Sequence, residues 1–526
     1  MPHRLLTGLA AAVFIAVFAA GAHAQDPLPA AVQDALRSAG LPADALAAVA
    51  LPLHPWARAW RHQAQRPMQP GSAMKLVTSV VALDRLGPNH RGFTELRSAA
   101  PLQEGTLQGD LVLKGGGDVE LGPPQFWALL VDLQQAGVRH IAGDLLLDRT
   151  RYSPARTDLG LPPFDEAPEF AYNVIPDALM VAGNLLPLTL RASETGVLAA
   201  TVPRIEGIEF DSRMLLVDAR CQDWHEQWQA AGVVSSHGSS QGSTYGSTYG
   251  STYRSTTGST RITLNGAFPR DCTVRAALQL IDRNELTERL FRSLWLGLGG
   301  TWSGRAREAQ APADTRLLAR RSGRPWGELL RHLNKSSDNT WTRLLYLELG
   351  VPDAAALPVL MAQETPQVAT QVATQDRAER SVRRWFAEHA IDDTGLVMDN
   401  GSGLSRSERI SPWQLARLLQ ESFKGRNAAE LQMSLPTAGV DGTLRNRLKN
   451  SPASGWARLK TGTLKNVVAL AGYVNDGDGK PWAVAIMINH DDASRGRPVL
   501  DAWVEHIARH GPHPAASMVG PQGESP

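Results

Sequence analysis

Residues 70–79 read PGSAMKLVTS and open with Pro70-Gly71, a pair that breaks the preceding chain. Apolar residues then recur at helical spacing until Gly87-Pro88, so we expect a helix that begins near Ser72. Lys75 lies three residues further on, one turn along the same helix face. A serine hydroxyl is a weak nucleophile at neutral pH and needs a nearby base. The stretch therefore predicts a serine nucleophile with a lysine as its base.

Two further motifs follow in order along the chain. Ser337-Asp338-Asn339 lies between helical patterns, and Lys460-Thr461-Gly462-Thr463 lies on a predicted strand. Each motif alone has a structural interpretation: a solvated helix face for the first, a turn or helix cap for the second, the end of a strand for the third. Together and in this order they resemble the signature of serine β-lactamases and penicillin-binding proteins. The three motifs indicate an acyl-transfer site.

The chemistry assigns a proton-transfer role to several of these side chains. Lys75 accepts a proton near pH 7 only if its pKa falls by about 3 units from ~10.4, which requires burial or a second cation. Lys460 is the natural second cation. We expect Ser337 to relay a proton from Lys75 or Lys460 to the leaving amine, and the Asn339 amide to hold Lys75 and the substrate backbone. Which lysine holds the proton in each step stays open.

The third motif predicts substrate-binding groups. The backbone N–H groups of Ser72 and Thr463 would form an oxyanion hole. The hydroxyls of Thr461 and Thr463, with Lys460, offer a pocket for a free carboxylate. Gly462 would let the substrate approach the strand closely.

Size, charge and the first residues limit the class of protein. A chain of 526 residues predicts two to four domains. With 53 basic and 52 acidic residues, nothing favours nucleic acid or an anionic membrane surface as a partner. Residues 1–24 have the basic, apolar and small-residue pattern of a secretory signal; the alternative is an uncleaved anchor. We expect cleavage, no later membrane-spanning segment, and a periplasmic location.

The chain contains two cysteines, Cys221 and Cys272, which are 51 positions apart. In an oxidising compartment they are expected to form a disulfide, which would stabilise the fold by roughly 4 kcal/mol on a chain-entropy basis. Two buried free thiols are the alternative. No cluster of His and Cys at ligand spacing surrounds either residue, so we expect no metal.

Biased segments mark the candidate loops. The tandem GSTYGSTYGSTY and its continuation, at 242–260, predict a surface loop, with a strand as the alternative. A second repeat, QVATQVAT at 367–374, predicts a loop or frayed helix end, and residues 513–526 predict a disordered tail.

The remaining patterns predict α and β elements. We expect short β runs from Thr94 to Leu147, with a turn at Gly115-Gly116-Gly117, a helix near Phe126 to Gln135 and a strand at Asp144 to Leu147. Helical amphipathicity returns from Val274 to Leu298. Near the C-terminus we expect an antiparallel meander covered by a final helix, with strands and helix at Ala457 to Thr463, Val467 to Val474, Trp482 to Asn489 and Pro498 to Arg509.

Four stretches resemble the D-alanyl-D-alanine carboxypeptidases/endopeptidases of the serine peptidase S13 family, which are low-molecular-mass penicillin-binding proteins. They are PGSAMKLVTS at 70–79, KSSDNTWTRLL at 335–345, DNGSGLSR at 399–406, and LPTAGVDGTLRNRL at 435–448 leading into LKTGTLKNVVALAGYV at 459–474. The resemblance covers nearly the whole chain after the predicted signal. The GSTY tandem is a departure from it.

The resemblance implies an α/β (α+β) transpeptidase-like domain, with an antiparallel sheet flanked by helices, formed by 25–93 and 286–512. The 265 positions between Ser72 and Ser337 would hold one or two largely β accessory domains at 94–285, including a cysteine pair such as Cys221 and Cys272. It also implies hydrolysis of D-Ala-D-Ala bonds in peptidoglycan stem peptides or cross-links through an acyl-enzyme on Ser72, acylation by penicillins, and no cofactor. The balance of carboxypeptidase and endopeptidase action stays open, as does the oligomeric state.

Two other functions remain as alternatives. A β-lactamase would share the nucleophile, but the sequence lacks an evident Glu-x-x-Leu-Asn segment and has the long insertion. A non-catalytic wall-binding scaffold would keep the fold and use the inserted part as its working surface, although all motif residues are intact.

Overall fold

The computed structural model describes residues 25–55, 57–161, 164–165, 167–235, 258–352 and 373–512. The predicted signal peptide, most of the GSTY loop, most of the second repeat and the tail lie outside these residues, at 1–24, 242–257, 367–372 and 513–526. Within the described part of the chain, no helix has both the length and the apolar character needed to cross a membrane.

The N- and C-terminal regions share one antiparallel sheet. Its strand order is β19-β20-β21-β1-β2, with every neighbouring pair antiparallel. The predicted meander is therefore present, and an N-terminal hairpin extends it. The bounds are β1 Leu46–Pro52, β2 Trp60–His62, β19 Arg458–Leu464, β20 Val467–Asn475 and β21 Pro481–Asn489.

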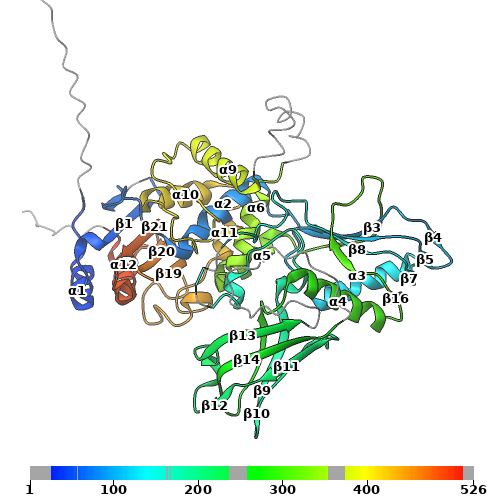
Figure 1. Cartoon of the computed structure of the whole chain (residues 1–526). Helices are drawn as coiled ribbons and strands as arrows, with labels where there is room; N and C mark the ends of the chain where they lie inside the picture. The colour runs from blue at the N-terminus through cyan, green and yellow to red at the C-terminus, as the bar shows by residue number, and fades with distance from the viewer. Residues whose placement is uncertain are drawn as a thin grey trace, which may run out of the picture.

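Both faces of this sheet are buried because side chains alternate between two hydrophobic clusters. Ala47, Val49 and Leu51 enter one cluster, whereas their neighbours Ala48 and Ala50 enter the other. The second face is covered by two helices that lie side by side at the left of Figure 1, α1 (Ala30–Ala39) and α12 (Arg497–His510).

The first face packs against the helical layer that carries two of the three motifs. α2 and α10 lie in this layer, and α10 contacts β1 and β21 directly. The layer consists of α2 Lys75–Arg85, α5 Trp326–Ser336, α6 Asn339–Glu348, α9 Thr374–Glu388, α10 Pro412–Lys424 and α11 Ala428–Ser434. A helical layer against an antiparallel sheet is the predicted fold class of the catalytic part.

The inserted part is largely β and has its own hydrophobic cluster. It occupies the right and lower parts of Figure 1. Two of its sheets contain β3 Phe93–Ser98, β4 Leu102–Gln103, β5 Thr106–Leu107, β6 Leu111–Gly116, β7 His140–Ile141, β8 Leu145–Asp148, β16 Thr301–Trp302, β17 Ala306–Glu308 and β18 Arg316–Ser322. The other two contain β9 Leu186–Ser193, β10 Gly196–Thr201, β11 Ile208–Ser212, β12 Leu215–Val217, β13 Trp228–Ser235, β14 Thr260–Pro269 and β15 Thr273–Leu278. Its helices are α3 Pro123–Gln135 and α4 Arg283–Gly297.

Strand pairing shows that the inserted part ends later in the chain than predicted. β16, β17 and β18 pair with β7, β8 and β3, and side chains of α4 and β16 lie in the cluster of the inserted part. The boundary predicted at residue 285 therefore comes too early, because the paired strands continue to Ser322.

Two local predictions were wrong. Residues 274–278 belong to strand β15, which pairs with β9, and the helix α4 begins only at Arg283. Gly115 and Gly116 lie within β6 rather than in a turn. A Cβ at Gly116 would lie 2.5 Å from the Phe93 ring, so this glycine allows a neighbouring side chain to cover the strand.

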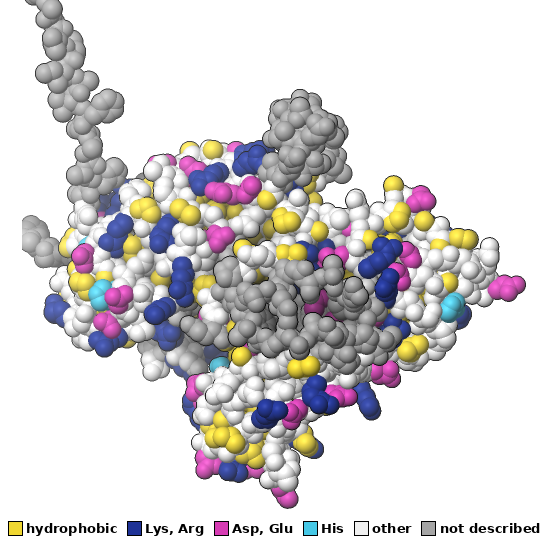
Figure 2. Space-filling model, in the orientation of Figure 1, with side chains coloured by type: hydrophobic (Ala, Val, Ile, Leu, Met, Phe, Trp, Pro, Cys, Tyr) yellow, Lys and Arg dark blue, Asp and Glu magenta, His cyan; other side chains and the backbone are white. Residues whose placement is uncertain are grey.

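Figure 2 shows Lys and Arg side chains interspersed with acidic ones over the face it presents. This mixture agrees with the net charge of +1.

Candidate active site

The first motif places a serine beside a buried lysine. Ser72 lies in the short 3₁₀ turn Gly71–Met74, and Lys75 is the first residue of α2. The Lys75 side chain is fully buried, and its Nζ lies 3.0 Å from Ser72 Oγ. Nζ also donates to Asn339 Oδ1 at 2.7 Å and to the Ser402 carbonyl at 2.5 Å.

These contacts assign the amine's hydrogen-bonding groups. Asn339 Oδ1 and the Ser402 carbonyl oxygen only accept hydrogen bonds, so they take both N–H groups of a neutral amine. Its lone pair is then left for the third neighbour, the Ser72 hydroxyl. Asn339 Nδ2 donates to the Tyr172 carbonyl at 3.2 Å, which orients the amide with its oxygen towards Lys75.

The environment of Lys75 favours this neutral form. Burial lowers the pKa of Lys75 well below its ordinary value, and the nearby charge of Lys460 lowers this pKa further. The carboxylates of Glu408 and Asp338 act in the opposite direction but do not reverse the shift. Burial and a second cation are the two causes of a lowered lysine pKa that the sequence analysis named, and both act on Lys75.

The second and third motifs meet in another serine–lysine pair, Ser337 and Lys460. Ser337 directly follows α5 as its C-cap, with a φ of 61°, a left-handed conformation that is rare for a non-glycine residue. Its Oγ accepts a hydrogen bond of 2.8 Å from Lys460 Nζ. Asp338 accepts from the Trp341 N–H and so caps α6, which places Asn339 at the start of that helix. Burial lowers the pKa of Lys460 to about 7.

The structure gives a reason for a glycine at position 462 that the sequence analysis did not name. A Cβ at this position would lie 2.2 Å from the Pro70 carbonyl oxygen and 3.2 Å from the Ala73 nitrogen. The glycine therefore lets the segment around Ser72 pack directly against β19. Contact between Gly462 and a substrate remains a proposal.

The residues predicted to bind a carboxylate, Lys460, Thr461 and Thr463, lie on β19 at the edge of the sheet. Thr461 is buried and its hydroxyl hydrogen-bonds to the Thr443 hydroxyl at 2.8 Å, whereas Thr463 is exposed. β19 is the outermost described strand of its sheet, and the segment Pro436-Thr437 pairs with its first residues, Arg458 and Leu459. Thr443 was not singled out from the sequence.

The loop at 399–403 contributes a further group that sequence reasoning missed. This segment belongs to one of the stretches that carry the family resemblance, and no role was assigned to its residues. The Ser402 carbonyl binds Lys75 directly. The buried Glu408 carboxylate holds the loop by accepting from the Gly401 and Gly403 N–H groups at 2.7 and 2.8 Å. Burial raises the pKa of Glu408 to about 7 although these N–H groups oppose the shift. A glutamate just after a glycine-rich loop was the available signal.

The cysteines lie apart from this constellation. Cys221 and Cys272 form a disulfide in the inserted part. Among the described residues, no three His, Cys, Asp or Glu side chains are grouped so as to hold a metal ion.

Comparison with known proteins places this arrangement in a family. Residues 28–509 match the D-Ala-D-Ala carboxypeptidase 3 (S13) family. The chain belongs to this family.

Family members with known names span most of the chain. A D-alanyl-D-alanine carboxypeptidase from Actinomadura sp. (strain R39) is 29% identical over 457 residues, covering 85% of this chain and 78% of the relative. The D-alanyl-D-alanine carboxypeptidase DacB of Haemophilus influenzae is 25% identical over 431 residues, covering 80% of each chain. The resemblance inferred from the motifs is thereby confirmed.

A solved structure supports the fold. The crystal structure of penicillin binding protein 4 (dacB) from Haemophilus influenzae superposes with a TM-score of 0.68 at 22% sequence identity, covering 91% of this chain and 99% of the other. The predicted fold class is confirmed.

Proposed function

We propose that this S13 family member is a serine D-Ala-D-Ala carboxypeptidase and D,D-endopeptidase that acts on peptidoglycan stem peptides and their cross-links. The observation that carries the proposal is the set of contacts around Lys75. Its two N–H groups have acceptors in Asn339 and Ser402, and its remaining neighbour is Ser72 Oγ at 3.0 Å. A neutral lysine held in this way is a base for the serine hydroxyl.

In the acylation step, Lys75 takes the proton of Ser72 while Oγ attacks the carbonyl carbon of the penultimate D-alanine. The backbone N–H groups of Ser72 and Thr463 are proposed to hold the oxyanion, each contributing up to ~3–4 kcal/mol to transition-state stabilisation. The acyl peptide would lie along the edge of β19, where main-chain groups can extend the sheet.

Collapse of the tetrahedral intermediate breaks the C–N bond and needs a proton on the leaving amine. Ser337 is the proposed relay, because its hydroxyl accepts a hydrogen bond of 2.8 Å from Lys460 Nζ and can pass a proton to the departing nitrogen. Water then hydrolyses the Ser72 ester, which releases the shortened stem peptide and regenerates the serine. Thr461 and Lys460 are proposed to bind the leaving residue's carboxylate.

The proposed substrate and the disulfide both favour a location outside the cytoplasm. Peptidoglycan lies outside the cytoplasm, and the bond between Cys221 and Cys272 suits an oxidising space. With the predicted signal peptide, a periplasmic location is proposed. A penicillin carries a strained amide in place of the D-Ala-D-Ala bond, so it is expected to acylate the same serine.

The test is incubation with a fluorescent penicillin, followed by peptide mass mapping of the label and by assays on purified monomeric and cross-linked muropeptides. We expect slowly clearing label on Ser72, none in Ser72→Ala, and release of D-alanine or of an uncross-linked strand. Rapid turnover of the β-lactam nitrocefin would support a β-lactamase instead. A folded protein that takes up no label and cleaves no muropeptide would support the scaffold.

A further inference from the structure

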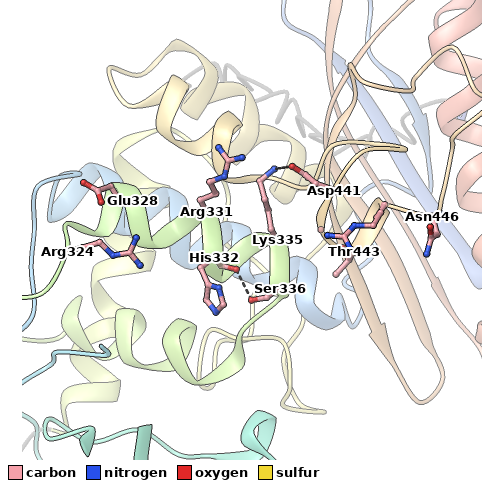
Figure 3. Close-up of a pocket in the computed structure, with 11 residues that line it drawn as sticks. Arg324, Glu328, Arg331, His332, Lys335, Ser336, Asp441, Thr443 and Asn446 are labelled. Carbon is pink, nitrogen blue, oxygen red and sulfur yellow. Dashed lines mark hydrogen bonds and ion pairs between the residues drawn. The ribbon is translucent and has the colours of Figure 1, made fainter. Parts of the chain in front are cut away.

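A pocket of about 810 Å³ opens between α5 and the segment that precedes β19. Figure 3 shows α5 on one side of it and the residues around Thr443 on the other. No residue of the proposed reaction lines this pocket. The lining residues are Arg324, Glu328, Arg331, His332, Lys335, Ser336, Asp441, Gly442, Thr443, Arg445 and Asn446.

The pocket adjoins the active site on the leaving-group side. Ser336 directly precedes Ser337, the proposed relay to the leaving amine. The Thr443 hydroxyl is hydrogen-bonded to the Thr461 hydroxyl. Thr461 is one of the residues proposed to bind the carboxylate of the leaving residue. A leaving group longer than one residue would therefore extend from Thr461 past Thr443 into the pocket.

The charges in the pocket leave two arginines available to a ligand. Lys335 is paired with Asp441 at 2.5 Å, and in Figure 3 its amine points to that carboxylate. Arg324 is paired with Glu120 at 2.7 Å. Arg331 and Arg445 are exposed and form no ion pair with any residue that the structure describes. Glu328 is the one other acidic side chain that lines the pocket.

We propose that this pocket binds the carboxylates of the leaving stem peptide when a cross-link is hydrolysed, with Arg331 and Arg445 as the binding groups. The proposal rests on the proposed peptidase function and deepens it by naming a leaving-strand subsite. Its volume falls in the range of sites for molecules far larger than one amino acid, so free D-alanine does not require it. Guanidinium groups bind carboxylates in a bidentate geometry, which suits an acidic peptide.

The experiment compares two substrates that share the same acyl part. One is a linear stem peptide that loses D-alanine, and the other is a cross-linked dimer that loses an acidic strand. We expect the double variant Arg331→Gln/Arg445→Gln to raise KM for the dimer about tenfold and to change both kcat and the hydrolysis of the linear peptide less than about twofold. Arg261→Gln, which changes an exposed arginine on β14, is the matched control.

A second measurement uses the unmodified protein. One carboxylate of the leaving strand, the one proposed to bind Thr461 and Lys460, is left free. Amidation of the other carboxylates on that strand is expected to raise KM to the value seen with the double variant, and to remove the difference between the two proteins. Equal KM values for amidated and unamidated dimers, or equal losses on linear and cross-linked substrates, would overturn the proposal. Label on Ser72 from penicillin, which has no leaving strand, reports separately whether the peptidase function itself holds.

Discussion

The catalytic part and the inserted part bury cations in opposite ways. Lys75 and Lys460 are fully buried, and neither forms an ion pair with any described residue. In the inserted part, Arg283 is only 5% exposed and lies between two buried carboxylates, those of Asp158 and Asp177. Burial lowers the pKa of Arg283, and these two carboxylates more than offset it, so the guanidinium stays charged.

This difference separates a reactive cation from a structural one. A guanidinium does not lose its proton in proteins, so its burial requires paired acids. An amine can lose its proton, and a lysine buried without a carboxylate partner becomes a base. The neutral amine is therefore useful at the active site, whereas the charged arginine joins α4 to the segment around Asp177.

The largest expected effect is on the reactive cation. Lys75→Met removes the base but keeps an apolar side chain of similar length in the buried site. We expect penicillin acylation to slow by about 10³-fold, because general-base catalysis is lost. Asn339 Oδ1 and the Ser402 carbonyl lose their donor, so the free energy of unfolding should fall by about 1–3 kcal/mol, less than for a buried charge left unpaired. Stopped-flow acylation and urea unfolding measure the two quantities, and acylation within tenfold of the wild type would contradict the assignment.

The structural cation should show the reverse pattern. Arg283→Met leaves the buried Asp177 with fewer partners, so we expect the free energy of unfolding to fall by about 3–5 kcal/mol. The folded variant should still take up penicillin. The control Arg261→Met removes an exposed arginine with a side chain 65% accessible and is expected to cost about 0–1 kcal/mol. Equal losses in the two variants would show that the buried network is not stabilising.

A smaller effect is expected from the loop that holds Lys75. In Glu408→Gln, the amide NH₂ faces a backbone N–H donor where a carboxylate oxygen accepted, so the loop carrying Ser402 should shift. We expect acylation to slow about tenfold, the equivalent of one unsatisfied buried group. Glu194→Gln, at an exposed position of the inserted part, is the matched control and should acylate at the wild-type rate. An unchanged rate in Glu408→Gln would remove this positioning role.

The sequence predicted the elements whose signals are local. The meander follows from short polar turns between apolar runs, and the bounds of β20 and β21 differ by one residue from the prediction. The helix after Ser72 follows from its periodicity, and the position of Ser337 between α5 and α6 follows from the helical patterns on either side.

The remainder depended on contacts between residues distant in the chain. Residues 274–278 are strand because they pair with β9, which no local period shows. The pairing of β18 with β3, which moves the boundary of the inserted part, is also long-range. Glu408 was not predicted as a site residue, because glutamates are mostly exposed and its burial depends on the N–H groups of a folded loop.

The central claim is that Lys75 is neutral when Ser72 attacks. The most direct test is the pH dependence of the second-order rate constant for penicillin acylation, measured from about pH 5 to 10. Over this range, a base with a lowered pKa gives a different pH profile from a lysine with an ordinary pKa. We predict that the rate constant stops rising well below pH ~10, because burial and the nearby charge of Lys460 hold the pKa of Lys75 well below its usual value. A rate constant that still rises about tenfold per unit through pH 9, as for an amine of pKa ~10.4, would contradict it.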